Sequence, residues 1–167
     1  MNDLATASQP PDRESAIASD TKLELKVWLR LLTCTTLIER EVRQKLRERF
    51  DTTIARFDLL SQLDRAPKGL TMGELSSRLM VTNGNVTGLT DALLREGLVS
   101  RAPEPGDRRS LRIRLTHTGK QFFDAMTPVH ERWIDQLMTG ITRAEMAHLL
   151  ELLGKLKRSL AAAGAQK

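Results

Sequence analysis

The sequence predicts a mainly α-helical fold with a small β-hairpin wing, namely a winged helix-turn-helix with long N- and C-terminal dimerisation helices. Three observations support this prediction. Apolar residues recur at helical spacing over residues 20–50 and 117–162. Two shorter helical segments lie between these regions and are joined by a tight turn. Residues 98–116 then alternate apolar and polar side chains around a turn that contains proline and glycine.

The first helix is expected to start at the capping box Thr21-x-x-Glu24 and to continue to about Arg49. In such a box, a hydroxyl and a carboxylate three residues apart each bind a backbone N–H that the helix start leaves without a partner. One continuous apolar stripe follows, formed by Trp28, Leu31, Leu32, Ile38, Val42 and Leu46.

The second helix is expected from about Thr52 or Thr53 to Arg65. It must end before Pro67, because a proline disfavours helical backbone in the residue that precedes it.

The helix-turn-helix comes next. It consists of a short helix from the capping box Thr71-x-x-Glu74, a turn over 80–83 and a helix over about 83–96. Gly97 is expected to end the longer helix in the left-handed conformation. The apolar face of this helix is predicted to hold Val86, Leu89, Leu93 and Leu94. Its other face is predicted to expose Asn83, Asn85, Thr87, Thr90 and Asp91.

Residues 98–116, LVSRAPEPGDRRSLRIRLT, predict two short strands joined by a basic hairpin tip. Along the second strand, the leucine and isoleucine side chains (111, 113, 115) face one way and Arg112 and Arg114 the other, as in a half-buried strand. Five arginines against Glu104 and Asp107 leave this hairpin with a net charge of +3. Such a hairpin beside two short helices suits the minor groove and the backbone of DNA.

Thr116 is expected to cap a long helix that Pro128 should bend. The last helix is predicted from the capping box Thr142-x-x-Glu145 to about Leu160, before a loose AAAGAQK tail. We therefore expect a disordered tail over 1–19, a helical dimerisation region over 20–50 and 117–162, and a DNA-binding winged helix-turn-helix over 51–116.

The composition narrows the class of partner. A net charge of +5 and an isoelectric point near 9.8 favour a polyanion. Tyrosine is absent and aromatic residues make up only 4% of the chain, so bases of a single strand find few stacking partners and duplex DNA fits better. With no secretory signal, no membrane-length apolar run and one cysteine, we expect a cytoplasmic protein with no membrane association.

The long terminal helices carry more apolar surface than a small winged domain can cover, so a symmetric homodimer is expected. A two-fold protein matches a pseudo-palindromic operator, because the major groove of double-stranded DNA repeats about every 34 to 36 Å.

The hairpin also resembles a known signature. Asp107-x-Arg109, then five residues and Leu115-Thr116, is similar to the signature of the MarR (multiple antibiotic resistance regulator) family of winged-helix transcription factors. MGELSSRL, VTGLTDALLREGLVSR and LTHTGK resemble the family's segments in the same order, and the resemblance covers about residues 21–160. It implies a homodimer with intertwined terminal helices and wings that straddle the minor grooves. It also implies that Asp107 holds Arg109 in place, so that Arg109 enters the minor groove.

The candidate DNA contacts follow from side-chain chemistry and from this resemblance. Asparagine pairs with adenine in two hydrogen bonds, threonine contacts a thymine methyl or a phosphate, and a helix N-terminus attracts phosphate. Gly84 either lets the backbone approach DNA closely or is a flexible cap. The predicted DNA-binding residues are Thr71, Asn83, Asn85, Thr87, Arg101, Arg108, Arg109 and Arg112, with Asp107 as the residue that orients the wing.

Other chemistries have little support. Cys34 lies in the apolar-rich LLTCTTLIE with neither a tyrosine nor a cation beside it, so buried packing is expected in preference to the redox sensing of one branch of the family. His117, His130 and His148 show no i, i+4 spacing, so no metal site is expected. No catalytic motif is present, so we expect neither an enzyme nor a cofactor.

A small-molecule effector is implied by the resemblance, because many family members leave DNA when they bind small aromatic acids or related compounds. An acidic aromatic ligand, or its coenzyme A thioester, is the hypothesis here; the alternative is surface charge beside ordinary core aromatics. The residues that suggest the ligand are Trp28, Arg30, Arg40, Arg43, Arg56 and Phe57. The function expected is that of a ligand-responsive repressor, and the alternatives are a winged-helix protein-interaction module without DNA binding or a cysteine-based redox-sensing regulator.

Overall fold

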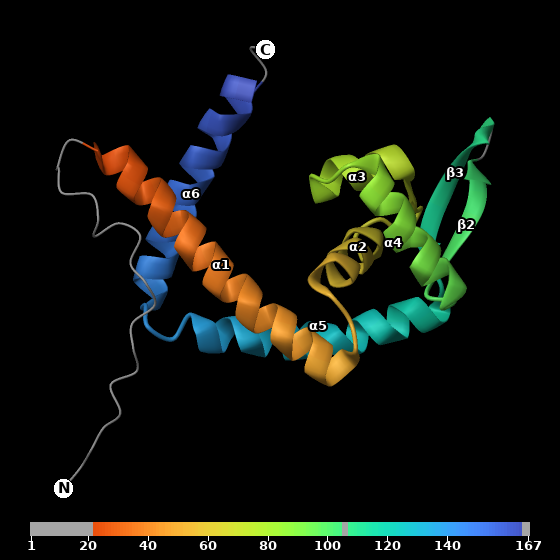
Figure 1. Cartoon of the computed structure of the whole chain (residues 1–167), viewed down its shortest axis with the longest axis horizontal. Coiled ribbons are helices and arrows are strands. Elements are labelled where there is room, and N and C mark those ends of the chain that lie inside the picture. Colours follow the sequence, from red (N-terminus) through yellow and green to blue (C-terminus); the bar gives the residue numbers. More distant parts are fainter. Residues whose placement is uncertain (1–21, 105–106, 165–167) are drawn as a thin grey trace, which may run out of the picture. The chain divides into compact units, whose positions relative to one another are not determined.

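The computed structural model of the chain describes residues 22–104 and 107–164, without the side chains of residues 83, 104 and 107–110. The elements follow in the order α1 (Leu23–Phe50), α2 (Ile54–Asp64), β1 (Leu70–Thr71), α3 (Met72–Leu79), α4 (Asn83–Arg95), β2 (Val99–Glu104), β3 (Asp107–Leu115), α5 (His117–Leu137) and α6 (Arg143–Gly164) (Figure 1).

The chain forms two compact units, one up to Met126 and one from Thr127 onward. The first unit holds α1 to α4, the sheet and the first half of α5. The second holds the remainder of α5, in which Pro128 lies, and α6.

Most predicted helix starts are confirmed, because caps depend on local chemistry. Thr71 and Glu74 form both hydrogen bonds of a capping box, and Thr142 and Glu145 make the same contacts before α6. The hydroxyl of Thr116 accepts from the N–H of Gly119 at 2.9 Å, as predicted for the start of α5.

Two predicted helix ends differ from the structure. Thr21 lies outside the described residues, and the N-cap of α1 is Lys22, which makes no side-chain cap hydrogen bond. At the other end of the chain, α6 continues to Gly164, past the expected end at Leu160. Three of the four added residues are alanines, which have the highest helix propensity, and the helix ends at Gly164.

The sheet is antiparallel with the order β1-β3-β2, so the predicted hairpin has a third strand. Leu70 pairs with Ile113 and Thr71 with Arg112. β1 was missed because two residues show no alternation from which a strand can be predicted. Its pairing fixes the base of the wing to the start of α3.

The core of the first unit is formed by buried side chains of the second half of α1, of α2 to α4, of the sheet and of the first half of α5. Phe57 packs against Phe123 of α5 with ring centroids 5.4 Å apart. Thr90 is fully buried, so its predicted exposure on α4 is wrong. The reason is spacing: Thr90 lies four residues after Val86 and three before Leu93, both buried, and so belongs to the core face. The fully buried side chains are Leu46, Leu59, Leu60, Leu63, Leu75, Val86, Thr90, Leu93, Ile113 and Met126.

Two helices expose several apolar side chains each, and Met80, Val81 and Leu111 are exposed elsewhere. Helix α6 has no buried residue, and the first half of α1 exposes Trp28 to 57%. Cys34 is exposed as well, so its expected burial is wrong for this chain. No described helix is both long and apolar enough to cross a membrane. The exposed apolar residues of these two helices are Leu23, Leu25, Val27, Trp28, Leu32, Leu149, Leu150, Leu152, Leu153, Leu156 and Leu160.

Candidate nucleic-acid interface and an adjoining cavity

The first half of α4 presents small polar groups away from the core. Asn85 and Thr87 are exposed, whereas Val86 between them is fully buried. The backbone of Asn83 begins the helix, but its side chain lies outside the described part. Thr82 is the N-cap and makes no side-chain cap hydrogen bond, so its hydroxyl leaves the first backbone N–H groups of α4 available.

Gly84 lies in this exposed first turn of α4. A Cβ atom added to it would meet nothing within 4 Å. Packing inside the protein therefore does not require a glycine here, and the bare backbone is open to an outside partner.

The wing is attached to α4 by an ion pair. Arg101 of β2 donates to the carboxylate of Asp91 on α4 at 3.0 Å. This predicted DNA-binding side chain therefore joins the wing to the helix beside it.

Two further wing arginines hold the turn before β1. Arg112 donates to the carbonyl of Gly69 at 2.7 Å and lies 3.7 Å from the carboxylate of Glu74. Arg114 donates to the carbonyl of Lys68 at 2.9 Å. The period-2 pattern placed these side chains on one face, and the structure adds that they bind protein carbonyls there.

Thr71, another predicted DNA contact, is used in the cap of α3. Its hydroxyl accepts from the N–H of Glu74 at 3.2 Å and also contacts the carboxylate of Glu74 at 3.0 Å. The hydrogen bond from the backbone N–H of Thr71 holds the pKa of Glu74 below its ordinary value, with help from the hydroxyl of Thr71. The ionised form of Glu74 is therefore favoured.

The wing tip is only partly described. Asp107, Arg108 and Arg109 belong to β3 by their backbone, and Asp107 pairs with Glu104 of β2. Their side chains lie outside the described part, so the Asp107 to Arg109 contact stays a prediction.

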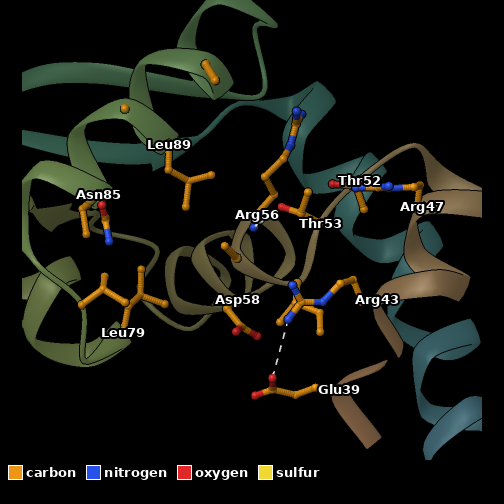
Figure 2. A pocket seen from close by; sticks show the side chains of 16 residues that line it. Glu39, Arg43, Arg47, Thr52, Thr53, Arg56, Asp58, Leu79, Asn85 and Leu89 are labelled. Atoms are coloured by element: carbon orange, nitrogen blue, oxygen red, sulfur yellow. Dashed lines mark hydrogen bonds and ion pairs between the residues drawn. The ribbon is translucent and has the colours of Figure 1, made fainter. Parts of the chain in front are cut away.

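A cavity of about 680 Å³ lies beside α4, within the first unit. Figure 2 shows Leu79, Asn85 and Leu89 on one side of it, opposite Arg43 and Glu39. One side is thus largely apolar, and the other offers charged groups from the second half of α1 and the start of α2. The residues that line the cavity include Arg43, Arg47, Thr52, Arg56, Leu79 and Leu89.

Of the six predicted ligand residues, Arg43 and Arg56 line this cavity. Phe57 is buried against Phe123, and Arg40 is exposed and pairs with Glu41 at 3.5 Å. Trp28 and Arg30 belong to the first half of α1. Because a helix rises about 1.5 Å per residue, Trp28 is about 22 Å along α1 from Arg43.

Sequence reasoning missed Arg47, Thr52 and the apolar side of the cavity. Arg47 could have been found, because Glu39, Arg43 and Arg47 follow one another at intervals of four residues and share one face of α1. Leu79 and Leu89 could not, since their contribution depends on how α3 and α4 pack. Among the described residues, Arg47 makes no ion pair and the buried hydroxyl of Thr52 has no hydrogen-bond partner.

Arg56 connects the cavity to the end of α4. Its Nη1 donates to Oε1 of Glu96 at 2.9 Å, and its Nη2 donates to Oε2 of the same carboxylate. Its Nε is buried and has no acceptor among the described residues.

The residues that the structure describes contain no group of three or more histidine, cysteine, aspartate or glutamate side chains that could hold a metal ion. The site defined by these elements is that of a winged helix-turn-helix protein, with a polar helix face, an attached basic hairpin and a cavity that residues from α1 to α4 line.

Comparisons with known proteins give the family. A model of the MarR family matches residues 50–110. The chain is 33% identical over 118 residues to YkoM, an HTH-type transcriptional regulator of Bacillus subtilis. The matched region covers 70% of this chain and 74% of YkoM. A MarR family transcriptional regulator from Silicibacter pomeroyi has a similar structure, with a TM-score of 0.73 and 31% identity over 85% of this chain and 99% of that one.

The comparison extends to a structure with DNA. A mutant of MarR from E. coli complexed with operator DNA matches with a TM-score of 0.72 and 29% identity, over 83% of this chain and 99% of that one. This chain belongs to the MarR family, whose members are DNA-binding transcription factors and not enzymes. The predicted family and fold class are confirmed.

Proposed function

We propose that this protein is a homodimeric regulator that binds a pseudo-palindromic duplex operator and leaves it when a small aromatic acid, or its coenzyme A thioester, occupies the cavity. The main support is that α4 exposes Asn85 and Thr87 beside a wing that Arg101 joins to the same helix. A helix and a wing held in a fixed relation can engage a major groove and the minor groove next to it.

The residues divide into two roles in this proposal. Asn83, Asn85 and Thr87 contact bases or phosphates, and the open N-terminus of α4 adds attraction for phosphate. Arg108 and Arg109, oriented by Asp107, reach DNA from the wing tip. Arg101, Arg112 and Thr71 position the wing and α3, because each already binds a group of the protein.

The cavity supports the effector part of the proposal. Its volume of about 680 Å³ is within the range of small-molecule sites. Arg43, Arg47 and Arg56 offer charge to an anion, and Leu79 and Leu89 offer apolar contact to a ring. An aromatic carboxylate has both properties.

Arg109→Ala tests the DNA-binding part. The operator is obtained by selection from a random duplex library with the wild-type protein, and binding is followed by fluorescence anisotropy at several salt concentrations. The variant should bind more weakly, and the slope of log K against log salt should fall by about 0.9 if one phosphate contact is lost. Arg143→Ala, an exposed arginine at the start of α6, is the charge-matched control and should bind as the wild type does. Equal affinities for the wild type and Arg109→Ala would contradict the proposed wing contact.

A further inference from the structure

We propose that Arg56 transmits occupancy of the cavity to α4, because an anion in the cavity and Glu96 compete for the same guanidinium group. This inference rests on the proposed function, since it describes how the effector would weaken DNA binding. It follows from the position of Arg56, which is one of the residues that line the cavity and whose guanidinium group binds Glu96, the C-cap residue of α4.

The hydrogen bonds of Arg56 leave one donor unused. Both terminal nitrogens bind the carboxylate of Glu96, whereas Nε is buried without an acceptor among the described residues. Because Nε has no exposed surface, a carboxylate in the cavity takes Nε together with one terminal nitrogen only when the Arg56 side chain turns toward the cavity. An anion bound in this way satisfies Nε and removes one of the two hydrogen bonds to Glu96.

Glu96 depends on Arg56 because of its place in the helix. The C-terminal end of a helix carries partial negative charge, so a carboxylate there is unfavourable without a nearby cation. The guanidinium of Arg56 supplies that cation across a distance of 40 residues in sequence. Loss of one of the two hydrogen bonds to Glu96 weakens the attachment of the last turn of α4 to α2.

The end of α4 is also the start of the wing. Gly97 follows with a φ of +70°, and the N–H of Leu98 donates to the carbonyl of Leu93 at 3.0 Å. The hydroxyl of Thr116 donates to the carbonyl of Gly97 at 2.7 Å. A displacement at Glu96 therefore reaches both α4 and β2, the two elements proposed to contact DNA.

The other cavity arginines cannot take this role. Arg43 and Arg47 belong to α1, and Arg43 pairs with Glu39 of the same helix at 3.6 Å. They can strengthen the binding of an anion, but their contacts give them no connection to the end of α4.

A double-mutant cycle tests the contact without any ligand. The variants are Arg56→Gln, Glu96→Gln and the two combined, and the readout is the affinity of the full-length protein for the selected operator. Each single change should weaken binding by about tenfold, and the double variant should be no weaker than the weaker single variant, because all three lose the same contact. Additive losses, or no loss in the single variants, would overturn the inference.

Titration with benzoate tests the competition. Glu96→Gln should bind benzoate several-fold more tightly than the wild type, because Arg56 is released, and Arg56→Gln should bind it more weakly. Benzamide, the neutral analogue, should not distinguish the three proteins. Asp91→Asn removes one negative charge from the same helix outside the cavity, and its benzoate affinity should equal that of the wild type.

Equal benzoate affinity in the wild type and Glu96→Gln would overturn the competition. If benzoate binds none of the proteins, the aromatic-acid part of the proposed function fails, and the double-mutant cycle alone decides whether Arg56 and Glu96 act together on DNA binding. The two failures therefore give different results.

Discussion

Gly119 shows why one residue of the LTHTGK segment must be small. A Cβ atom at this position would lie 2.8 Å from the carbonyl carbon of Leu98 and would overlap its oxygen. The same Leu98 carbonyl accepts from the N–H of Thr116 at 3.1 Å, so the close approach joins the start of the wing to the start of α5. Composition and spacing do not reveal this contact, because its two sides lie 21 positions apart in the sequence.

Gly119→Ala should destabilise the protein by about 1 to 3 kcal/mol, since the backbone carbonyl it meets cannot rotate away as a side chain would. Gly84→Ala is the matched control. Its Cβ would meet no atom within 4 Å, so it should stabilise α4 by about 0.5 to 1 kcal/mol through helix propensity. Urea unfolding midpoints check both; shifts of the same sign would contradict the packing argument.

For the arginines of the wing, the alternating pattern predicts the face of the strand on which they lie but not the groups that they bind. The pattern assigned Arg112 and Arg114 to one face of the second strand, and both do bind groups of the protein there, the carbonyls of Gly69 and Lys68. The carbonyl acceptors belong to the turn before β1, about 45 residues away. A basic face was therefore predictable, but not its use as an anchor.

At the scale of elements, the helices with local start signals were predicted best. The capping boxes at Thr71 and Thr142 depend on side chains three residues apart, which the sequence displays directly. The Schellman-type end of α4 at Gly97 is local for the same reason. β1 and the cavity depend on tertiary packing, so no window of the sequence contains their signal.

Glu74 should make stability depend on pH. Its pKa is lowered in the folded protein, so the folded state binds a proton less readily than the unfolded state does. The contribution of the capping box is therefore present at neutral pH and is lost as the pH falls below the ordinary value of 4.5 and through the lower folded pKa. Wild-type stability should decrease more than that of Glu74→Gln between pH 7 and pH 3.5 in urea unfolding. Parallel decreases would contradict this reading of the cap.

At the scale of the whole molecule, the apolar surface was predictable from helical spacing alone. Six leucines of α6 are at least 36% exposed, and α6 has no buried residue. A surface of this kind needs a partner in water, and a second copy of the chain is the partner that we propose. The identity of the effector was not predictable, because residues from α1 to α4 line the cavity together.

Leu153→Glu should disrupt the proposed homodimer, because it places a charge among these leucines. The variant should sediment as a monomer at concentrations at which the wild type is a dimer, and its operator affinity should fall with it. Arg158→Gln makes the same one-unit change in charge on the opposite face of α6 and should remain dimeric. A dimeric Leu153→Glu would show that this face is not the interface.

Thr90 has one more consequence, for engineering. Its hydroxyl is buried in the core and has no hydrogen-bond partner among the described residues. An unsatisfied buried polar group lowers the free energy of unfolding by about 1 to 3 kcal/mol. Thr90→Val keeps the branched shape and removes that hydroxyl, so the thermal midpoint should rise by a few degrees. Calorimetry and an unchanged operator affinity would check this. The regulator thus has a position at which its heat tolerance can be raised independently of its response.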